Sequence, residues 1–93
     1  MQTTLTHSGT DPFWDRIAPK YAKKPISDLA SYEEKIATVR GLLSPSDRVL
    51  EIGCGTGSTA IAHAPHVKHI LATDISEKMI QISRQKVEHI FGH

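Results

Sequence analysis

The chain has 93 residues and a net charge of +1, and 39% of its residues are hydrophobic and 23% charged. This length allows one small domain, and the balanced charge lacks the excess of Lys and Arg typical of nucleic-acid-binding proteins. No apolar stretch approaches the roughly 20 residues of a membrane span, and the N-terminus does not resemble a signal peptide. The single cysteine, Cys54, excludes an intramolecular disulfide. We therefore expect a cytoplasmic protein with no nucleic-acid partner and no stable membrane insertion.

The N-terminal part of the chain is expected to contain a tail and two helices. Residues 1–10 are polar and without periodicity, which predicts a disordered tail. Asp11-Pro12 fits the N-cap and first position of a short aromatic-rich helix, which Pro19 should bend or end. Ser31 and Glu34 have capping-box spacing and predict the start of a second helix.

The rest of the chain alternates between strands and helices. We expect a strand over 48–52, a helix over 58–64, a second strand over 69–73 and a last helix that Ser76 caps. The order helix, helix, strand, helix, strand, helix predicts an α/β fold in which the strands are parallel. Two strands are too little sheet to bury on both faces, so residues 11–93 are expected to be the front part of a larger domain.

A glycine-rich turn joins the first predicted strand to the helix that follows it. Gly53, Gly55 and Gly57 tolerate the positive φ values of a tight turn and leave the backbone open to a ligand. Glu51 lies on the strand just before them, and its carboxylate would repel a pyrophosphate but attract the ammonium group of a methionine moiety. Ser58 stands where a dinucleotide-binding fingerprint needs Gly or Ala, and the spacing of a P-loop is absent.

An acidic residue follows the second predicted strand. Asp74 comes 21 positions after Gly53, and a carboxylate at the end of a strand can accept hydrogen bonds from both hydroxyls of a ribose. Capping the last helix is an alternative role for Asp74, for which Ser76 competes. Together with the glycine turn, this acid indicates a nucleoside-binding site at one edge of the sheet.

Three segments resemble a known family. Val-Leu-Glu-Ile-Gly-Cys-Gly-Thr-Gly at 49–57 resembles motif I of class I S-adenosylmethionine-dependent methyltransferases, and Ala-Thr-Asp-Ile-Ser-Glu-Lys-Met at 72–79 resembles their second motif. Residues 13–21 look like the N-terminal helix of the ubiquinone/menaquinone-biosynthesis-type branch. The resemblance implies the N-terminal part of a Rossmann-like fold, and an enzyme that methylates a small molecule with S-adenosylmethionine as methyl donor.

The resemblance also implies which residues contact the cofactor. Asp74 would hold the ribose, Ile75 would pack beside the adenine, and Tyr21 would close over the cofactor from the N-terminal helix. The turn would line the methionine end with Glu51, Gly53, Cys54, Gly55, Thr56 and Gly57. No catalytic residue is assigned, because methyl transfer mainly needs donor and acceptor held in contact away from water. Any general base is expected in the C-terminal part of the fold, beyond residue 93.

Simpler interpretations apply to other reactive residues. Cys54 has no evident acid–base partner and is interpreted as a small packing residue rather than a nucleophile. His63, His66 and His69 are spaced by three, but Pro65 interrupts any helix that would align them, so no metal site is expected.

Two other functions stay open at this point. The chain could be a non-catalytic fragment that binds cofactor weakly, or that self-associates through the edge left unpaired by the second strand. A nicotinamide-dependent oxidoreductase is disfavoured by Glu51 and Ser58. The lysines of the N-terminal helix are expected to form a solvated face, with contact to an acidic membrane surface as an alternative.

Overall fold

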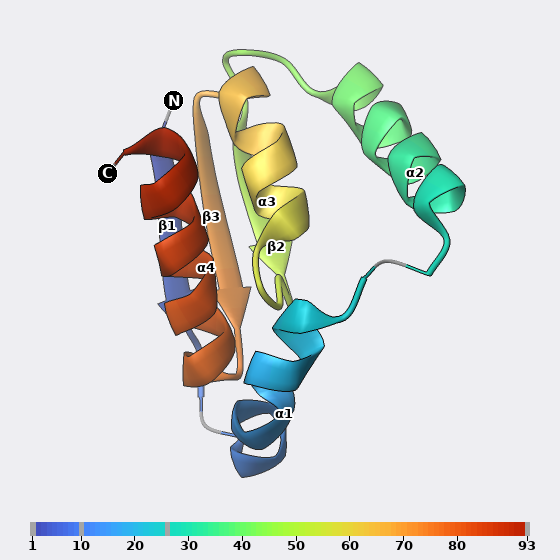
Figure 1. The fold of residues 1–93 in the computed structure, drawn as a ribbon. Helices are drawn as coiled ribbons and strands as arrows, with labels where there is room; N and C mark the ends of the chain where they lie inside the picture. The colour runs from blue at the N-terminus through green and yellow to red at the C-terminus, as the bar shows by residue number, and fades with distance from the viewer. Residues whose placement is uncertain (1, 10, 26, 93) are drawn as a thin grey trace.

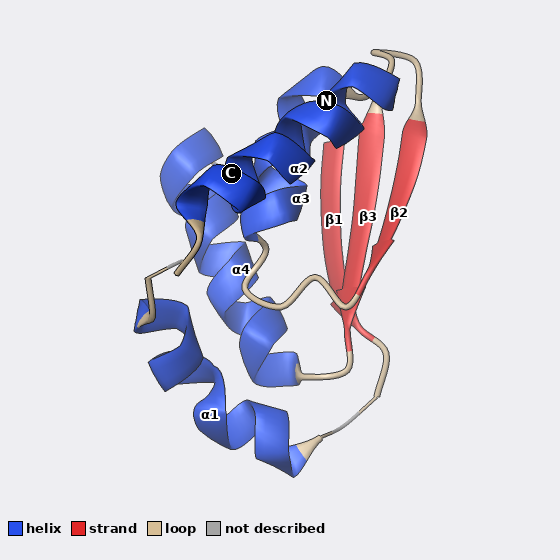
Figure 2. Cartoon of the chain, turned by 90° about the vertical axis from the view of Figure 1, so that its right-hand side faces the viewer, coloured by secondary structure: helices blue, strands red, loops and turns tan. Residues whose placement is uncertain are grey.

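The computed structural model describes residues 2–9, 11–25 and 27–92. It forms a parallel three-stranded sheet with helices packed on one side (Figures 1 and 2), so the predicted α/β class with parallel strands is confirmed. The elements in chain order are β1 (Gln2–His7), α1 (Pro12–Lys23), α2 (Leu29–Leu42), β2 (Arg48–Ile52), α3 (Ser58–His63), a 3₁₀ turn (Ala64–His66), β3 (His69–Asp74) and α4 (Glu77–Phe91).

Strand β1 corrects the prediction of a disordered tail over 1–10. Residues Gln2–His7 pair in parallel with β3, and Leu5 lies opposite Ala72. The sheet order is β1-β3-β2, so β3 is central and the edge expected to be unpaired is covered by β1. The polar sequence without periodicity did not indicate a strand. The strand forms nevertheless, because β-branched threonines favour strands and the buried Leu5 attaches it to the core.

Strands β2 and β3 confirm the predicted parallel pair. Their register places Val49 beside Ile70 and Ile52 beside Thr73. In parallel strands the carboxyl ends meet at the same edge of the sheet. The glycine turn that follows β2 and the acid that ends β3 are therefore brought to one edge, at the lower end of the sheet in Figure 1.

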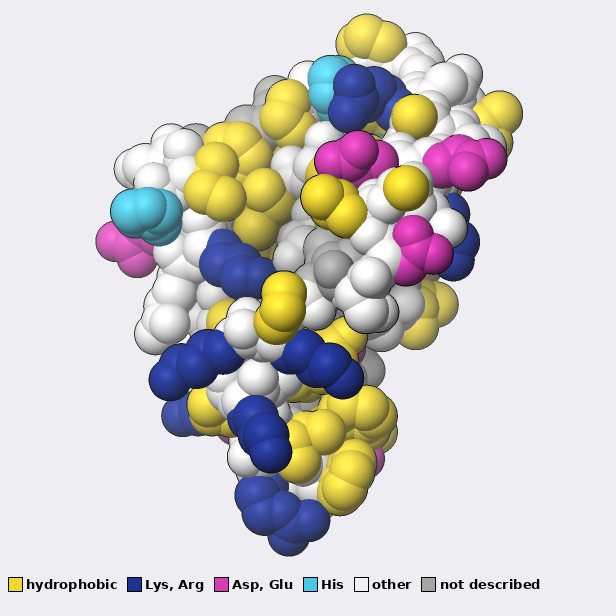
Figure 3. Space-filling model, turned by 45° about the vertical axis from the view of Figure 1, so that its right-hand side comes forward, with side chains coloured by type: hydrophobic (Ala, Val, Ile, Leu, Met, Phe, Trp, Pro, Cys, Tyr) yellow, Lys and Arg dark blue, Asp and Glu magenta, His cyan; other side chains and the backbone are white. Residues whose placement is uncertain are grey.

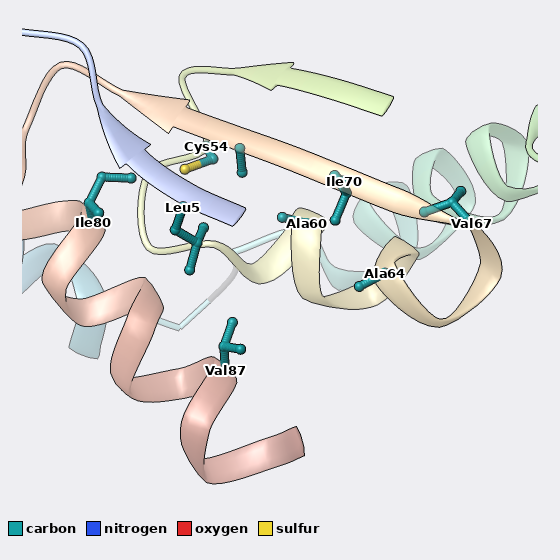
Figure 4. Close-up of a cluster of buried hydrophobic side chains, with 9 residues drawn as sticks. Leu5, Cys54, Ala60, Ala64, Val67, Ile70, Ile80 and Val87 are labelled. Carbon is teal, nitrogen blue, oxygen red and sulfur yellow. The ribbon is translucent and has the colours of Figure 1, made fainter. Parts of the chain in front are cut away.

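The hydrophobic core lies between the sheet and helices α3 and α4 (Figure 4). Ala60 on α3 and Ala72 on β3 are fully buried, and such small side chains allow the helix to pack closely on the sheet. The core side chains are Leu5, Cys54, Ala60, Ala64, Val67, Ile70, Ala72, Ile80 and Val87. The opposite face of the sheet carries no described helix (Figure 2), and Leu50 and Ile52 of β2 are exposed there.

The two N-terminal helices begin through acidic caps. The Asp11 side chain accepts hydrogen bonds from the backbone of Phe13 and Trp14, as predicted for α1, but the helix continues past Pro19. Helix α2 starts earlier than predicted, because Asp28 rather than Ser31 is its N-cap.

Helix α4 begins at the predicted cap. The Ser76 Oγ accepts a hydrogen bond from the backbone N–H of Met79 at 3.1 Å. Met79, Ile80 and Val87 of this helix are buried, whereas Ile90 near its end is 55% exposed. No helix within the described ranges is both long and apolar enough to cross a membrane.

Candidate functional site

The glycine turn has the backbone conformation that its sequence predicted. Gly53, Gly55 and Gly57 have φ values of 73°, 56° and 86°, in the left-handed region that disfavours other residues. A Cβ atom at Gly53 or Gly55 would meet no heavy atom within 4 Å, so these two positions border open space. A Cβ atom at Gly57 would lie 2.8 Å from the Oγ of Ser83, so α4 packs directly against this end of the turn.

Two side chains hold the middle of the turn in place. The Asp74 carboxylate accepts hydrogen bonds from the Gly55 N–H at 2.8 Å and from the Ser76 N–H at 2.9 Å. The Ser83 Oγ donates to the Gly55 carbonyl oxygen at 2.9 Å. A carboxylate offers about four acceptor sites, so Asp74 retains capacity for two hydroxyl donors. The N-cap of α4 is Ser76, which leaves Asp74 to the turn and to a ligand.

Two cavities open around this turn. The larger has a volume of about 520 Å³ and receives Glu51 from β2, Thr56 from the turn and Lys86 from α4. The smaller has a volume of about 310 Å³ and receives Asp74 from the end of β3. Both cavities are lined by Gly53, Gly55 and Tyr21. The open backbone of the turn thus lies between one cavity with charged groups of both signs and a second with a single carboxylate.

The smaller cavity has apolar walls beside its acid. Trp14 and Tyr21 from α1 line it together with Ile75 and Met79. The rings of Trp14 and Tyr21 meet edge to face, with their centroids 6.5 Å apart. One carboxylate among apolar and aromatic walls suits a planar heterocycle that carries hydroxyl groups.

Helix α1 reaches the site through a contact distant in sequence. Asp15 accepts hydrogen bonds from the Ser76 hydroxyl at 2.5 Å and from the Lys78 backbone N–H at 3.1 Å, at the start of α4. These bonds lower the pKa of Asp15, the Ser76 hydroxyl having the larger effect. Ala18 of the same helix is fully buried. The aromatic side chains of α1 are therefore positioned by polar contacts to the first turn of α4.

The larger cavity combines an acid with a buried thiol. Burial raises the pKa of Glu51, whose carboxylate lines the cavity. Burial also raises the pKa of Cys54 to about 11, with smaller contributions from Glu51 and Asp74. A thiol with this pKa stays protonated at neutral pH and is a poor nucleophile. Because Cys54 also belongs to the core cluster, its interpretation as a packing residue is confirmed.

The three histidines at positions 63, 66 and 69 lie in different surroundings. His63 is 3% exposed at the end of α3, and neither of its ring nitrogens has a hydrogen-bond partner. His66 is exposed in the 3₁₀ turn, and His69 shares a hydrogen bond with the Thr4 hydroxyl at 3.0 Å. In the part of the chain that the structure describes, no three His, Cys, Asp or Glu side chains are grouped so that they could hold a metal ion.

Nearly all of the predicted site residues come together at these cavities. Those lining one or both cavities are Tyr21, Glu51, Gly53, Cys54, Gly55, Thr56, Asp74 and Ile75. Gly57 lines neither cavity and is instead the N-cap of α3. Sequence reasoning missed Lys86 and Met79, because a lysine and a methionine on an amphipathic helix are ordinary surface and core residues.

Comparisons with known proteins agree with this architecture. Residues 49–91 match a family model described as a methyltransferase domain. The chain is 27% identical over 84 residues to demethylmenaquinone methyltransferase of Clavibacter sepedonicus, an alignment that covers 90% of this chain and 26% of that protein. It is 41% identical over 72 residues to ribosomal RNA small subunit methyltransferase A of Thermobifida fusca (strain YX), covering 71% of this chain and 25% of that protein.

Two further proteins share parts of the chain. Ribosomal protein L11 methyltransferase of Thermotoga neapolitana is 36% identical over 47 residues, which cover 50% of this chain and 18% of that protein. The crystal structure of the YcgJ protein from Bacillus subtilis superposes with a TM-score of 0.58 and 24% identity, over 61% of this chain and 25% of that one. The chain thus spans about a quarter or less of the length of the curated proteins it matches.

The fold is the N-terminal part of the Rossmann-like fold of class I methyltransferases, as predicted. Within this fold, residues 49–91 are similar to a methyltransferase domain. The similar proteins include one named for a quinone precursor, one for ribosomal RNA and one for a ribosomal protein, so the resemblance extends to the class and not to one acceptor.

Proposed function

We propose that this chain forms the S-adenosylmethionine-binding part of a methyltransferase that modifies a small molecule. The observation that carries this proposal is the pair of cavities on either side of Gly53 and Gly55, with Glu51 in one and Asp74 in the other. This arrangement matches a ligand with an amino-acid group at one end and a nucleoside at the other.

Each cavity suits one end of the ligand. In the larger cavity, the Glu51 carboxylate can bind the ammonium group of the methionine moiety. In the smaller cavity, Asp74 can accept the ribose hydroxyls while Ile75 and Met79 pack against the adenine. Tyr21 borders both cavities, so it lies beside the junction between the two ends of the ligand.

The donor, when bound, supplies a methyl group on a positively charged sulfur. The chain's own residues contribute binding and orientation of the donor, and Trp14 and Tyr21 of α1 line the smaller cavity. The bonds from Ser83 and Asp74 keep the turn in its binding conformation before the ligand arrives. Such preorganisation reduces the entropic cost of binding.

A small-molecule acceptor is supported by the extent of one alignment. The similarity to demethylmenaquinone methyltransferase covers 90% of the chain, so it includes at least most of α1 as well as the glycine turn. We assign the acceptor to the small, apolar class because the aromatic side chains of α1 lie at the border of the site. Phe13 is 52% exposed next to Trp14, with the ring centroids 5.4 Å apart.

A nucleic-acid acceptor is the second candidate, favoured by one surface feature. Lys20, Lys23 and Lys24 are exposed at the end of α1, and Figure 3 shows Lys and Arg side chains gathered over this lower part of the molecule. One similar protein is named for ribosomal RNA. Electrophoretic mobility shift with a ribosomal RNA hairpin at 50 and 200 mM salt would distinguish the candidates, because phosphate contacts weaken steeply with salt.

Calorimetric titration with S-adenosylhomocysteine tests the binding proposal. The parent chain should bind, Asp74→Asn should bind at least 10-fold more weakly, and the exposed Glu77→Gln variant should match the parent. Circular dichroism would verify that each variant is folded. Absence of binding by the parent, or an Asp74→Asn affinity equal to that of the parent, would contradict the proposal.

A further inference from the structure

Lys86 is a cation that the glycine turn holds at the larger cavity. Its Nζ donates hydrogen bonds to the Thr56 Oγ1 at 2.9 Å and to the Ser58 Oγ at 3.2 Å. An ammonium group has three N–H donors, and these two bonds to the turn leave one donor for another acceptor. The side chain is partly buried and lines the cavity together with both of its partners.

The hydrogen-bond partners of Lys86 among the described residues are hydroxyl groups and not carboxylates. Burial lowers the pKa of Lys86, and no charged side chain among the described residues adds to or opposes this shift. Glu51 lines the same cavity and is also partly buried, and burial raises the pKa of its carboxyl group. Charged groups that are partly removed from water are usually paired, so the partly buried Lys86 and Glu51 in one cavity favour a ligand that carries both signs.

We infer that Lys86 binds the carboxylate of the ligand's amino-acid group while Glu51 binds its ammonium group. This assignment rests on the proposed function and makes Lys86 a residue that selects for an intact amino acid at this end of the ligand. The hydroxyls of Thr56 and Ser58 fix the ammonium group of Lys86 beside the turn, and a hydroxyl accepts from this lysine without neutralising it.

Lys24 provides a matched control. It is the other lysine lining the larger cavity, but it is exposed at the C-cap of α1. An exposed ammonium group interacts weakly with a ligand because water screens its charge and its side chain is mobile. The two lysines therefore differ in burial and in how firmly each is held, while sharing the same cavity.

The test compares two ligands by calorimetric titration of the full chain. One is S-adenosylhomocysteine, and the other is its decarboxylated analogue, which keeps the ammonium group and the adenosine. Lys86→Met should weaken binding of the first by about 10- to 100-fold and change binding of the analogue by less than about twofold. Lys24→Met should leave both affinities within about twofold. Lys86→Gln, which keeps a donor for the turn, should show the same selective loss, and it serves if the Met variant does not fold.

A second measurement is independent of any variant. Nuclear magnetic resonance titration of the Lys86 Nζ should show that S-adenosylhomocysteine raises its pKa, because a carboxylate stabilises the charged form, whereas the analogue should not. Equal losses of affinity for both ligands would mean that Lys86 only stabilises the turn, and unchanged affinities would also overturn the inference. If the parent chain binds neither ligand, the proposed function itself fails, which is a different result from non-selective loss in the variants.

Discussion

Replacing Gly57 by alanine should destabilise the chain through two separate costs. At a φ of 86°, an L residue is strained by about 1–2 kcal/mol. The added Cβ would also lie 2.8 Å from the Oγ and 2.9 Å from the Cβ of Ser83. Ser83 is fully buried, and its one hydroxyl hydrogen is shared between the carbonyl oxygens of Gly55 and Met79, so it cannot move away freely. Overpacking of this kind costs about 1–3 kcal/mol, which gives a total of about 2–5 kcal/mol.

Gly53→Ala is the matched control for this prediction. Gly53 has a φ of 73°, but a Cβ there would meet no heavy atom within 4 Å, so only the backbone cost of about 1–2 kcal/mol applies. Urea denaturation followed by far-ultraviolet circular dichroism would give the free energy of unfolding of each variant. Gly57→Ala should lose about 1–3 kcal/mol more than Gly53→Ala, because only Gly57 packs against α4.

A double-mutant cycle isolates the close contact. Ser83→Gly removes both atoms that the new Cβ would approach, at its own cost in helix stability. The double variant Gly57→Ala with Ser83→Gly should therefore lose less free energy of unfolding than the two single variants lose together, by roughly 0.5–3 kcal/mol. Equal losses for the two glycine variants, or strictly additive effects in the cycle, would refute the argument that Ser83 requires a glycine at this position.

Three further predictions follow from the ionisable groups. Hydrogen bonds lower the pKa of Asp15, so its contact with Ser76 is present at neutral pH and is lost as the pH falls through that lowered pKa; Asp15→Ala should speed amide exchange in α1 at pH 7, and unchanged exchange would argue against this anchor. Burial is the main cause that lowers the pKa of His63 in the folded chain below 6.5. As the pH falls, His63 is therefore protonated in the unfolded chain before it is protonated in the folded chain, and the free energy of unfolding should decrease below pH 6.5. His63→Leu should flatten that dependence in urea titrations, and an identical slope would count against it. With a pKa of about 11, Cys54 should react with iodoacetamide at pH 8 only after denaturation, and rapid labelling of the folded chain would contradict its burial.

Local features of the site were predictable because short-range chemistry determines them. The φ values of Gly53 and Gly55 follow from the absence of a side chain, and the Ser76 cap follows from the orphan N–H groups of a helix start. Strand β2 and the end of β3 at Asp74 were likewise predictable, because each strand is a short apolar segment that ends at a glycine or an acidic residue.

Contacts between distant segments decided the rest. Strand β1 forms only because β3, more than 60 residues away in sequence, offers it an edge, and a threonine-rich segment shows no sign of this by itself. The bond from Ser76 to Asp15, which sets α1 over the smaller cavity, joins residues 61 positions apart. A lysine on an amphipathic helix such as Lys86 is usually a surface residue, and only the packing of α4 against the turn makes it part of the site.

The amino-acid sequence by itself thus determined the glycine turn, its two acids and the parallel strands that carry them, because backbone strain and hydrophobic patterning act over a few residues. Tertiary structure decided which outlying groups join the turn, namely α1 through Asp15, the edge strand β1, and the ammonium group of Lys86. These placements depend on which surfaces meet when the helices pack on the sheet, and that information is not contained in any single stretch of the chain.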